Sequence, residues 1–288
     1  MEKIKIFTDS ASDISFENEK NLDIDMINFN ITMGDRSYVS RVDFDNEAFY
    51  RLMGTYDGIP LTSQATAYEF QELYKKYYDE GYTDVIGILI NREGSATYDN
   101  SLMAYKLFLE DYPEAEGKFC VHAVDGQNYS GAYGYAAVEA AKMVKAGKNT
   151  EEIVAFAKDW VEHCVIYFVP YSLKYAGKSG RIPSAAALVG DKLGIKPVMK
   201  ISDHKITTAL TVRGEKRVVK KITEKTLSEM EEGTPYMIVY GDDPQVKDQM
   251  AEAMTEALGY GPTDFYQIGA AVAANAGPRV VGTIFREK

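Results

Sequence analysis

The sequence predicts an α/β protein with two domains. Residues 1–160 are expected to form a three-layer α/β/α domain around a parallel sheet, and residues 161–288 an α+β domain. The length of 288 residues exceeds what one small core usually encloses. In the first half, apolar runs of strand length alternate with amphipathic helical segments, which is the pattern of a parallel sheet covered on both faces. In the second half, strands follow one another more closely, which favours α+β.

Three apolar runs predict the strands of the first half, and amphipathic segments predict its helices. The strands are KIKIFTD at 3–9, DVIGILI at 84–90 and KFCVHAVD at 118–125. The helices are expected at 68–82, 97–112 and 129–146. Ligands of such sheets lie beyond the carboxyl ends of the strands, so the loops at those ends are where a site is expected.

A further helix is expected at 150–163, which starts at the capping pattern NTEE and leads into the strand VIYFVPY, and after it the pattern becomes strand-rich. Two further helices are expected at 215–231 and 244–258. The run 195–212, with SDHK at its turn, predicts a β-hairpin. The expected strands are IKPVMKIS, ITTALTV, YMIVYGD, DFYQIGAAVAAN and RVVGTIF.

The charge of the chain is unevenly distributed. The net charge of −11 argues against general nucleic-acid binding, which needs a cationic face to displace counterions. Residues 172–221 nevertheless hold twelve Lys and Arg against three Asp and Glu, whereas the rest of the chain holds twenty against forty. This basic segment is either a set of solvated helix faces or a face for an anionic ligand or acidic partner.

Targeting and metal signals are weak. The charged start MEKIKIF has no apolar stretch of signal-peptide length, and no run of about 18 apolar residues occurs, so a cytoplasmic protein without an integral membrane segment is expected. Cys120 and Cys164 lie in apolar stretches and are expected to be core residues rather than a disulfide. No Cys or His spacing matches a zinc site, and no metal is expected.

The common nucleotide and nucleophile motifs are missing: the sequence has neither GxxxxGK[ST], nor GxGxxG after a strand, nor GxSxG. Asp9 and Asp13 in TDSASD follow the first strand, where a magnesium-dependent phosphotransferase keeps its carboxylates. Asp and Ser are equally ordinary capping residues at such a place. A phosphotransferase that uses Asp9 therefore stays an alternative function.

Six polar segments lie at the ends of apolar elements. They are TDSASDI from Thr8, TSQATAYEF from Thr62, GSATYDNS from Gly94, VDGQNYSGAYG from Val124, SLKYAGKSGRI from Ser172 and AANAGPRVVG from Ala273. In this order, and with Lys196-Pro197 between the last two, the chain resembles the DegV family. The family pattern runs TDSxxD, TSQP, SGTYQS, Asp followed by SxGxG, LxYLxxGGRI, a strand with KP, and HxGPGxxG. The family includes the fatty-acid-binding subunits of bacterial fatty acid kinase.

The resemblance implies that the chain binds one long-chain fatty acid in a buried tunnel between the domains, without a cofactor or catalytic residues of its own. It implies a carrier that presents the acid to a separate ATP-binding kinase subunit, which makes the acyl phosphate, and that contacts membranes at most transiently. A lipid-bound sensor or interaction module is a further alternative. The resemblance assigns roles to three groups of residues. The carboxylate would be bound by Thr62, Ser63, Ser95, Thr97 and Asn275; Asp9, Ser10, Gly277 and Arg279 would support that site; and Arg181 and Arg213 would form the face for phosphate or the kinase.

Asn275 is the main departure from the family pattern, because it stands where the family has histidine. Asparagine can donate a hydrogen bond to the carboxyl group but does not titrate near neutral pH. The hypothesis is that this chain binds an acyl lipid but is a poor kinase substrate, or prefers another acyl lipid. Arg279 replaces a family glycine and either compensates for the lost histidine or faces solvent.

Thr62 is expected to be available for a ligand because another residue explains the helix start that follows it. Thr66 and Glu69 have the spacing of a capping box, with Ala65 and Phe70 at the staple positions. A fatty acid tail gains about 0.8 kcal/mol per buried CH₂, or roughly 12 kcal/mol for some fifteen, before association costs. The tail therefore supplies affinity, and hydroxyls such as that of Thr62 orient the head.

Overall fold

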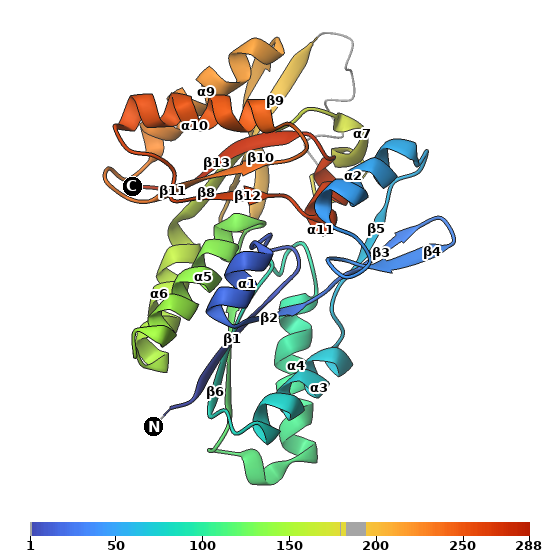
Figure 1. Ribbon diagram of the computed structural model, residues 1–288, viewed down its shortest axis with the longest axis vertical. Coiled ribbons are helices and arrows are strands. Elements are labelled where there is room, and N and C mark those ends of the chain that lie inside the picture. The colour runs from blue at the N-terminus through green and yellow to red at the C-terminus, as the bar shows by residue number, and fades with distance from the viewer. Residues whose placement is uncertain (1, 179, 183–193) are drawn as a thin grey trace.

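The computed structural model describes residues 2–178, 180–182 and 194–288, and Figure 1 shows them as two layered halves joined at the middle of the molecule. The first half is built on a sheet with the order β2-β1-β6-β7, in which all neighbouring strands are parallel. Its strands are β1 (Ile4–Asp9), β2 (Ile24–Ile27), β6 (Asp84–Leu89) and β7 (Cys120–Asp125). The predicted parallel sheet is therefore confirmed.

Helices cover both faces of this sheet and complete the three predicted layers. One face carries α3 (Ala67–Asp79) and α4 (Thr97–Asp111), and the other carries α1 (Phe16–Leu22), α5 (Gly131–Lys145) and α6 (Thr150–His163). Phe7 of β1 packs on α3, where its ring centre lies 6.1 to 6.2 Å from those of Phe70, Tyr74 and Tyr77. On the opposite side α5 is rich in alanine and glycine, so it packs closely against β1.

The second half is a mixed sheet with the order β10-β9-β8-β13-β11-β12. Its strands are β8 (Cys164–Pro170), β9 (Ile195–Ser202), β10 (Lys205–Arg213), β11 (Tyr236–Tyr240), β12 (Asp264–Gln267) and β13 (Val280–Arg286). The neighbouring pairs are antiparallel except for β11 and β12. The predicted hairpin of β9 and β10 is confirmed, with a left-handed turn at Asp203 and His204.

Side chains of this second sheet alternate between two cores. Val165, Tyr167 and Val169 of β8 point outward, into a core shared with α9 (Val218–Glu229) and α10 (Pro244–Leu258). Ile166 and Phe168 of the same strand point to the other face and join the large core of the first half. The sheet therefore has one face covered by its own helices and one turned toward the first half.

A small third sheet, β4-β3-β5, was not predicted from the sequence. It comprises β3 (Asn30–Met33), β4 (Arg36–Val39) and β5 (Leu61–Ser63), with α2 (Asn46–Thr55) beside it. These strands have three or four residues and contain Asn, Thr, Arg and Ser, so they show no readable apolar alternation. The third sheet places Thr62 opposite Ile31 on a sheet edge rather than in a loop.

One predicted strand is wrong in its second part. The segment DFYQIGAAVAAN forms β12 and then turns at Gly269 into the helix α11 (Ala270–Ala276). Alanine has the highest helix propensity, which outweighs the apolar character that suggested a strand. The predicted helix 215–231 also begins later, because residues 215–217 form a 3₁₀ turn before α9. The remaining short elements are α7 (Leu173–Ala176) and a 3₁₀ turn at 113–115.

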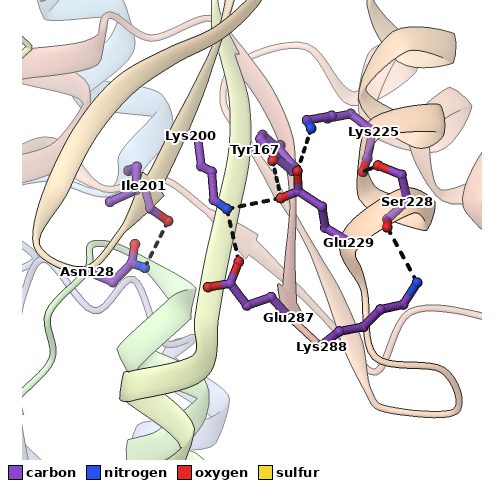
Figure 2. A network of polar contacts seen from close by, with 9 residues as sticks. All are labelled: Asn128, Tyr167, Lys200, Ile201, Lys225, Ser228, Glu229, Glu287 and Lys288. Atoms are coloured by element: carbon purple, nitrogen blue, oxygen red, sulfur yellow. Dashed lines mark hydrogen bonds and ion pairs between the residues drawn. The ribbon is translucent and has the colours of Figure 1, made fainter.

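The first sheet uses the chain up to Asp125 and the second uses it from Cys164 onward; the domain boundary between 160 and 161 remains a prediction. Across the halves, Asn128 Nδ2 donates to the Cys164 carbonyl at 3.0 Å. It also donates to the Ile201 carbonyl at 3.5 Å (Figure 2). Gly269 N–H donates to Asp13 Oδ1 at 2.8 Å. Within the described ranges, every helix is too short or too polar to cross a membrane.

A charged network links β8, β9 and α9 to Glu287, which follows β13 (Figure 2). Lys200 Nζ lies 3.0 Å from Glu229 and 2.9 Å from Glu287, and Tyr167 and Lys225 also donate to Glu229. Burial alone would raise the pKa of Glu229, but the hydrogen bonds from Lys225, Tyr167 and Lys200 outweigh it and lower the pKa from 4.5 to about 2.

Replacing Glu229 by glutamine is expected to lower the free energy of unfolding at pH 7 by about 1 to 2 kcal/mol, a value reduced for solvent screening of this partly exposed group. A carboxylate whose pKa is lower in the folded than in the unfolded chain stabilises the fold at pH values above its unfolded pKa. The loss of stability in Glu229→Gln should therefore be full above pH 4.5 and fade toward pH 2. Urea unfolding of both proteins between pH 3 and 7 measures it. The neighbouring Ser228→Ala variant is the control, and a Glu229→Gln loss that does not change with pH would contradict this account.

Candidate functional site

A cavity lies between the carboxyl ends of the first sheet and the inward face of the second. Ala11 follows β1 and Ile90 follows β6, and both line the cavity. After β1 the chain adds β2 on one side of it and later adds β6 on its other side. The direction in which strands are added therefore reverses between β1 and β6. In open parallel sheets, ligands bind in the crevice at such a point.

The inner wall of the cavity is apolar. The second sheet contributes Ile166, Phe168, Ile201, Val239 and Val280 from its inward face. The helix α11 contributes Ala271, Val272 and Ala276 on one side. The cavity therefore suits a chain of apolar atoms.

Most polar lining residues, though not the buried Ser130, gather where the cavity meets solvent. Thr62, Ser95 and Asn275 are half-buried, whereas Ser63, Gln64 and Arg181 are exposed. The apolar residues of the inner wall are mostly buried. The cavity is thus amphipathic, with hydroxyls, amides and one cation at its mouth and hydrocarbon inside.

The strand β5 brings Thr62 to the mouth, and the loop before α4 brings Ser95 there. Thr66 accepts from Glu69 N–H at 3.2 Å and Glu69 accepts from Thr66 N–H at 2.7 Å, so the predicted capping box at the start of α3 is confirmed. Asn100 Nδ2 of α4 donates to the Ala65 carbonyl at 2.7 Å, which ties the loop after Thr62 to the helix that follows Ser95. The hydroxyl of Thr62 has no part in the cap.

Thr97 supports Ser95 and does not line the cavity. Its side chain is fully buried at the first position of α4, and its hydroxyl lies 2.9 Å from that of Ser95. Thr97 N–H also donates to Ser95 Oγ, at 3.3 Å. Ser95 therefore sits at the N-terminal end of a 15-residue helix, where the helix dipole favours negative charge.

Asn275 is on α11 and faces the mouth. Its Nδ2 donates to the Ala271 carbonyl at 2.8 Å, which fixes the side chain along its own helix. The helix is anchored at its start, where Tyr50 OH donates to the Ile268 carbonyl and Gly269 N–H donates to Asp13. Gly277 ends it with a φ of +86°, and a Cβ there would lie 3.0 Å from Tyr175, so this glycine shapes the loop without lining the cavity.

Asp9 and Ser10 are buried braces behind the cavity. Asp9 accepts from Ala11 N–H at 3.0 Å, Ile90 N–H at 2.7 Å and Tyr133 OH at 2.6 Å. Burial raises the pKa of Asp9 to about 6, although these three hydrogen bonds lower it. Ser10 Oγ accepts from Phe29 N–H at 2.9 Å. In the part of the chain that the structure describes, no three His, Cys, Asp or Glu side chains are grouped to hold a metal.

The three arginines to which the family resemblance gave a role lie in different places. Arg181 lines the cavity and also a hollow at its mouth, together with His204 and Lys205. Arg279 forms ion pairs with Asp243 at 3.1 Å and Glu215 at 3.3 Å and stacks 4.3 Å from the Tyr171 ring centre. It therefore neither lines the cavity nor extends freely into solvent, contrary to both expectations. Arg213 is exposed at the end of β10 and does not line the cavity.

Several lining residues were not predicted. Gln64, Tyr129 and Ser130 belong to segments that the sequence singled out, but nothing in those segments indicated which side chains face the cavity. The strand VIYFVPY reads as buried on both faces, so its sequence does not show that Ile166 and Phe168 would meet a ligand. The structure therefore brings Thr62, Ser63, Ser95, Asn275 and Arg181 together at one mouth, and leaves Asp9, Ser10, Thr97, Gly277, Arg213 and Arg279 off the lining.

Comparison with known proteins gives consistent results. A family model described as "Uncharacterised protein, DegV family" matches residues 3–288. The DegV domain-containing protein CPE0304 of Clostridium perfringens is 31% identical over 229 residues, covering 80% of this chain and 79% of that relative. A protein from the same organism, CPE2509, is 28% identical over the full length of both chains.

Solved structures share the fold. A stearic acid-binding protein from Eubacterium ventriosum superposes with a TM-score of 0.87 at 22% identity, covering 99% of this chain and 98% of that one. A DegV lipid-binding protein from Thermotoga maritima has a TM-score of 0.82 at 26% identity, with the same coverage. The predicted fold class, a parallel α/β sheet domain with a separate mixed sheet, is confirmed by these matches and by the strand pairing.

Proposed function

This chain belongs to the DegV family, and from that premise we propose that it binds one long-chain fatty acid in the cavity between its two sheets. The carboxylate lies at the mouth, where the hydroxyls of Thr62 and Ser95 and the amide of Asn275 bind it. Ser63 and Arg181 lie beside it, and the tail follows the apolar wall. The proposal includes a carrier role, in which the acid is presented to a separate kinase subunit for acyl phosphate formation.

The amphipathic lining of the cavity is the observation that carries this proposal. A tail buried against Ile166, Phe168 and Ile201 gains about 0.8 kcal/mol per CH₂, so affinity comes from its length. A carboxylate costs several kcal/mol if it is buried without hydrogen bonds, so it belongs at the mouth with the hydroxyls. Fatty acids bound by relatives of the same fold, stearic acid among them, support this choice of ligand.

Native mass spectrometry of the purified protein, followed by extraction and identification of any bound lipid, tests the proposal directly. One fatty acid per chain is the expected result, and added acid of 14 to 20 carbons should exchange with it. A protein that is isolated empty and ignores these acids would contradict fatty acid binding. Bound lipid that does not exchange would instead favour the alternative of a sensor or interaction module with structural lipid.

Replacing Asn275 by histidine is expected to increase acyl phosphate formation by a competent fatty acid kinase, while fatty acid affinity changes by less than about threefold. Histidine can carry charge near neutral pH beside the carboxylate, and asparagine cannot. Turnover with the kinase and binding of the acid, measured on both proteins, separate the two effects. Unchanged acyl phosphate formation in Asn275→His would overturn the idea that this residue limits coupling to a kinase.

Arg213 lies outside the cavity, so its proposed role is on the partner face alone. It is exposed beside Lys216, Arg217 and Lys220, which suits an acidic partner surface. The Arg213→Glu variant should weaken kinase binding by about tenfold at low salt and leave bound lipid unchanged. Kinase affinity and lipid content measured together check this, and no change in affinity would remove Arg213 from the interface.

The phosphotransferase alternative finds no support in the position of Asp9. Both carboxyl oxygens of Asp9 already accept hydrogen bonds from the protein, and the side chain is fully buried behind the cavity. Magnesium-dependent turnover by the purified chain alone would revive that alternative.

A further inference from the structure

Ser130 is a buried serine with an unusual backbone conformation on the wall of the cavity. It lines the cavity, is 2% exposed, and has a φ of 53° and a ψ of −144° directly before α5. A serine at this position normally accepts a hydrogen bond from an amide of the first helical turn. Ser130 makes no such bond. Its hydroxyl is therefore not used for capping, in a backbone region that is costly for a residue other than glycine.

The hydroxyl of Ser130 and one oxygen of Asp13 are both unpaired. Among the described residues, neither Ser130 Oγ nor Asp13 Oδ2 has a partner at hydrogen-bond geometry. Burial raises the pKa of Asp13 to about 7, and the nearby Ser130 hydroxyl is the leading influence that lowers it. The Ser130 hydroxyl is therefore a buried group of the cavity wall whose hydrogen bonds are left to a ligand.

An unpaired polar atom on this wall needs a partner from the ligand. Ala11, whose carbonyl accepts the Ser130 N–H at 3.0 Å, lines the same wall with a methyl group. A buried acceptor without a donor costs free energy, and a plain alkyl chain offers no donor. A hydroxyl on the chain would supply one.

We propose that Ser130 forms a second polar subsite inside the cavity, which hydrogen-bonds with a hydroxyl group carried on the acyl chain. This inference rests on the proposed fatty acid function and specifies its substrate class as hydroxylated long-chain acids. A serine hydroxyl both donates and accepts, so a hydroxyl on the chain can pair with it in either direction.

The test compares binding of stearic acid and its positional hydroxy isomers by isothermal calorimetry. For the wild-type chain, one hydroxy isomer should bind about tenfold more tightly than stearic acid. In Ser130→Ala, that isomer and stearic acid should bind with the same affinity.

Two further variants complete the test. Ser130→Gly tolerates the positive φ and replaces Ser130→Ala if alanine impairs folding. Ser101→Ala is the matched control, since Ser101 is a fully buried serine that donates to the Tyr98 carbonyl away from the cavity lining, and it should leave the preference intact.

Three outcomes would overturn the inference: no hydroxy isomer binds more tightly than stearic acid, the gain survives in both Ser130 variants, or a crystal structure with the preferred isomer shows only a water on Ser130. Stearic acid binding without discrimination would contradict this inference and leave the proposed function standing. A protein that binds none of these acids would overturn both.

Discussion

Replacing Thr62 by valine and Ser95 by alanine in the same chain is expected to weaken binding of a long-chain fatty acid by about 10² to 10⁴-fold. Each hydroxyl is proposed to donate one hydrogen bond to the carboxylate, and a hydrogen bond to a charged group contributes about 1.5 to 3 kcal/mol. The apolar inner wall is untouched, so residual binding through the tail should remain. Titration with a fluorescent fatty acid, or calorimetry after delipidation, measures the loss.

The matched control for this double variant is Thr211→Val, an exposed threonine on β10 that does not line the cavity. Its affinity should stay within about twofold of wild type. The double variant must also unfold at about the same denaturant concentration as the wild type, since a misfolded chain would likewise fail to bind. An affinity that stays at the wild-type value in a well-folded double variant would place the carboxylate somewhere other than at this mouth.

Replacing Gly134 by alanine is expected to lower the free energy of unfolding by about 2 to 3 kcal/mol. Gly134 lies in α5, and a Cβ there would be 2.2 Å from the Ser12 carbonyl oxygen and 3.2 Å from the ring of Tyr266. The Ser12 atom is backbone, so it cannot rotate away as a side chain would. The helix has to move off the loop after β1, and this also disturbs Ser130 at the helix start.

Gly54→Ala provides the matched control for Gly134. Gly54 is exposed in α2, and no atom lies within 4 Å of the position its Cβ would take. Alanine should therefore stabilise the chain there by up to about 1 kcal/mol through helix propensity. Chemical unfolding of the two variants should give shifts of opposite sign. Equal shifts would show that the close approach of α5 to Ser12 is not what limits this position.

The elements that the sequence predicted well carry their own local signals. The helix at 150–163 has the predicted bounds, because Asn149 and Glu152 form a capping box at its start. The helix at 244–258 is equally accurate, with Asp243 as its cap and proline at its first position. Local hydrogen bonds of this kind depend on residues three or four apart, so a sequence alone reveals them.

The elements that were missed or wrong depend on distant partners. The strands β3, β4 and β5 exist through pairing with each other and have too few apolar residues to be read individually. The sequence predicts a strand where α11 lies. The start of α11 is fixed by Asp13, which is 256 residues away in the chain. Tertiary contacts such as these override or replace the local pattern.

The residues of the candidate site show the same contrast between local signals and distant partners. Thr62, Ser63, Ser95 and Asn275 were singled out by motif, and the structure places them at one mouth. Whether a side chain faces the mouth or is occupied elsewhere depends on partners that no local pattern shows. Thr97 is turned into the protein beside Ser95, and Arg279 is held by Glu215 and Asp243. The sequence likewise leaves open which face of β8 meets the ligand.

The walls of the cavity come from both ends of the chain, and this has a consequence for its synthesis. Ala11 leaves the ribosome long before Val280, and both line the cavity. The cavity therefore cannot close before the segment that contains Val280 has left the ribosome, and a lipid cannot be enclosed until then. Until then Ala11 and Ile90 at the carboxyl ends of the first sheet stay uncovered, so the nascent chain offers chaperones an apolar surface that the folded protein hides.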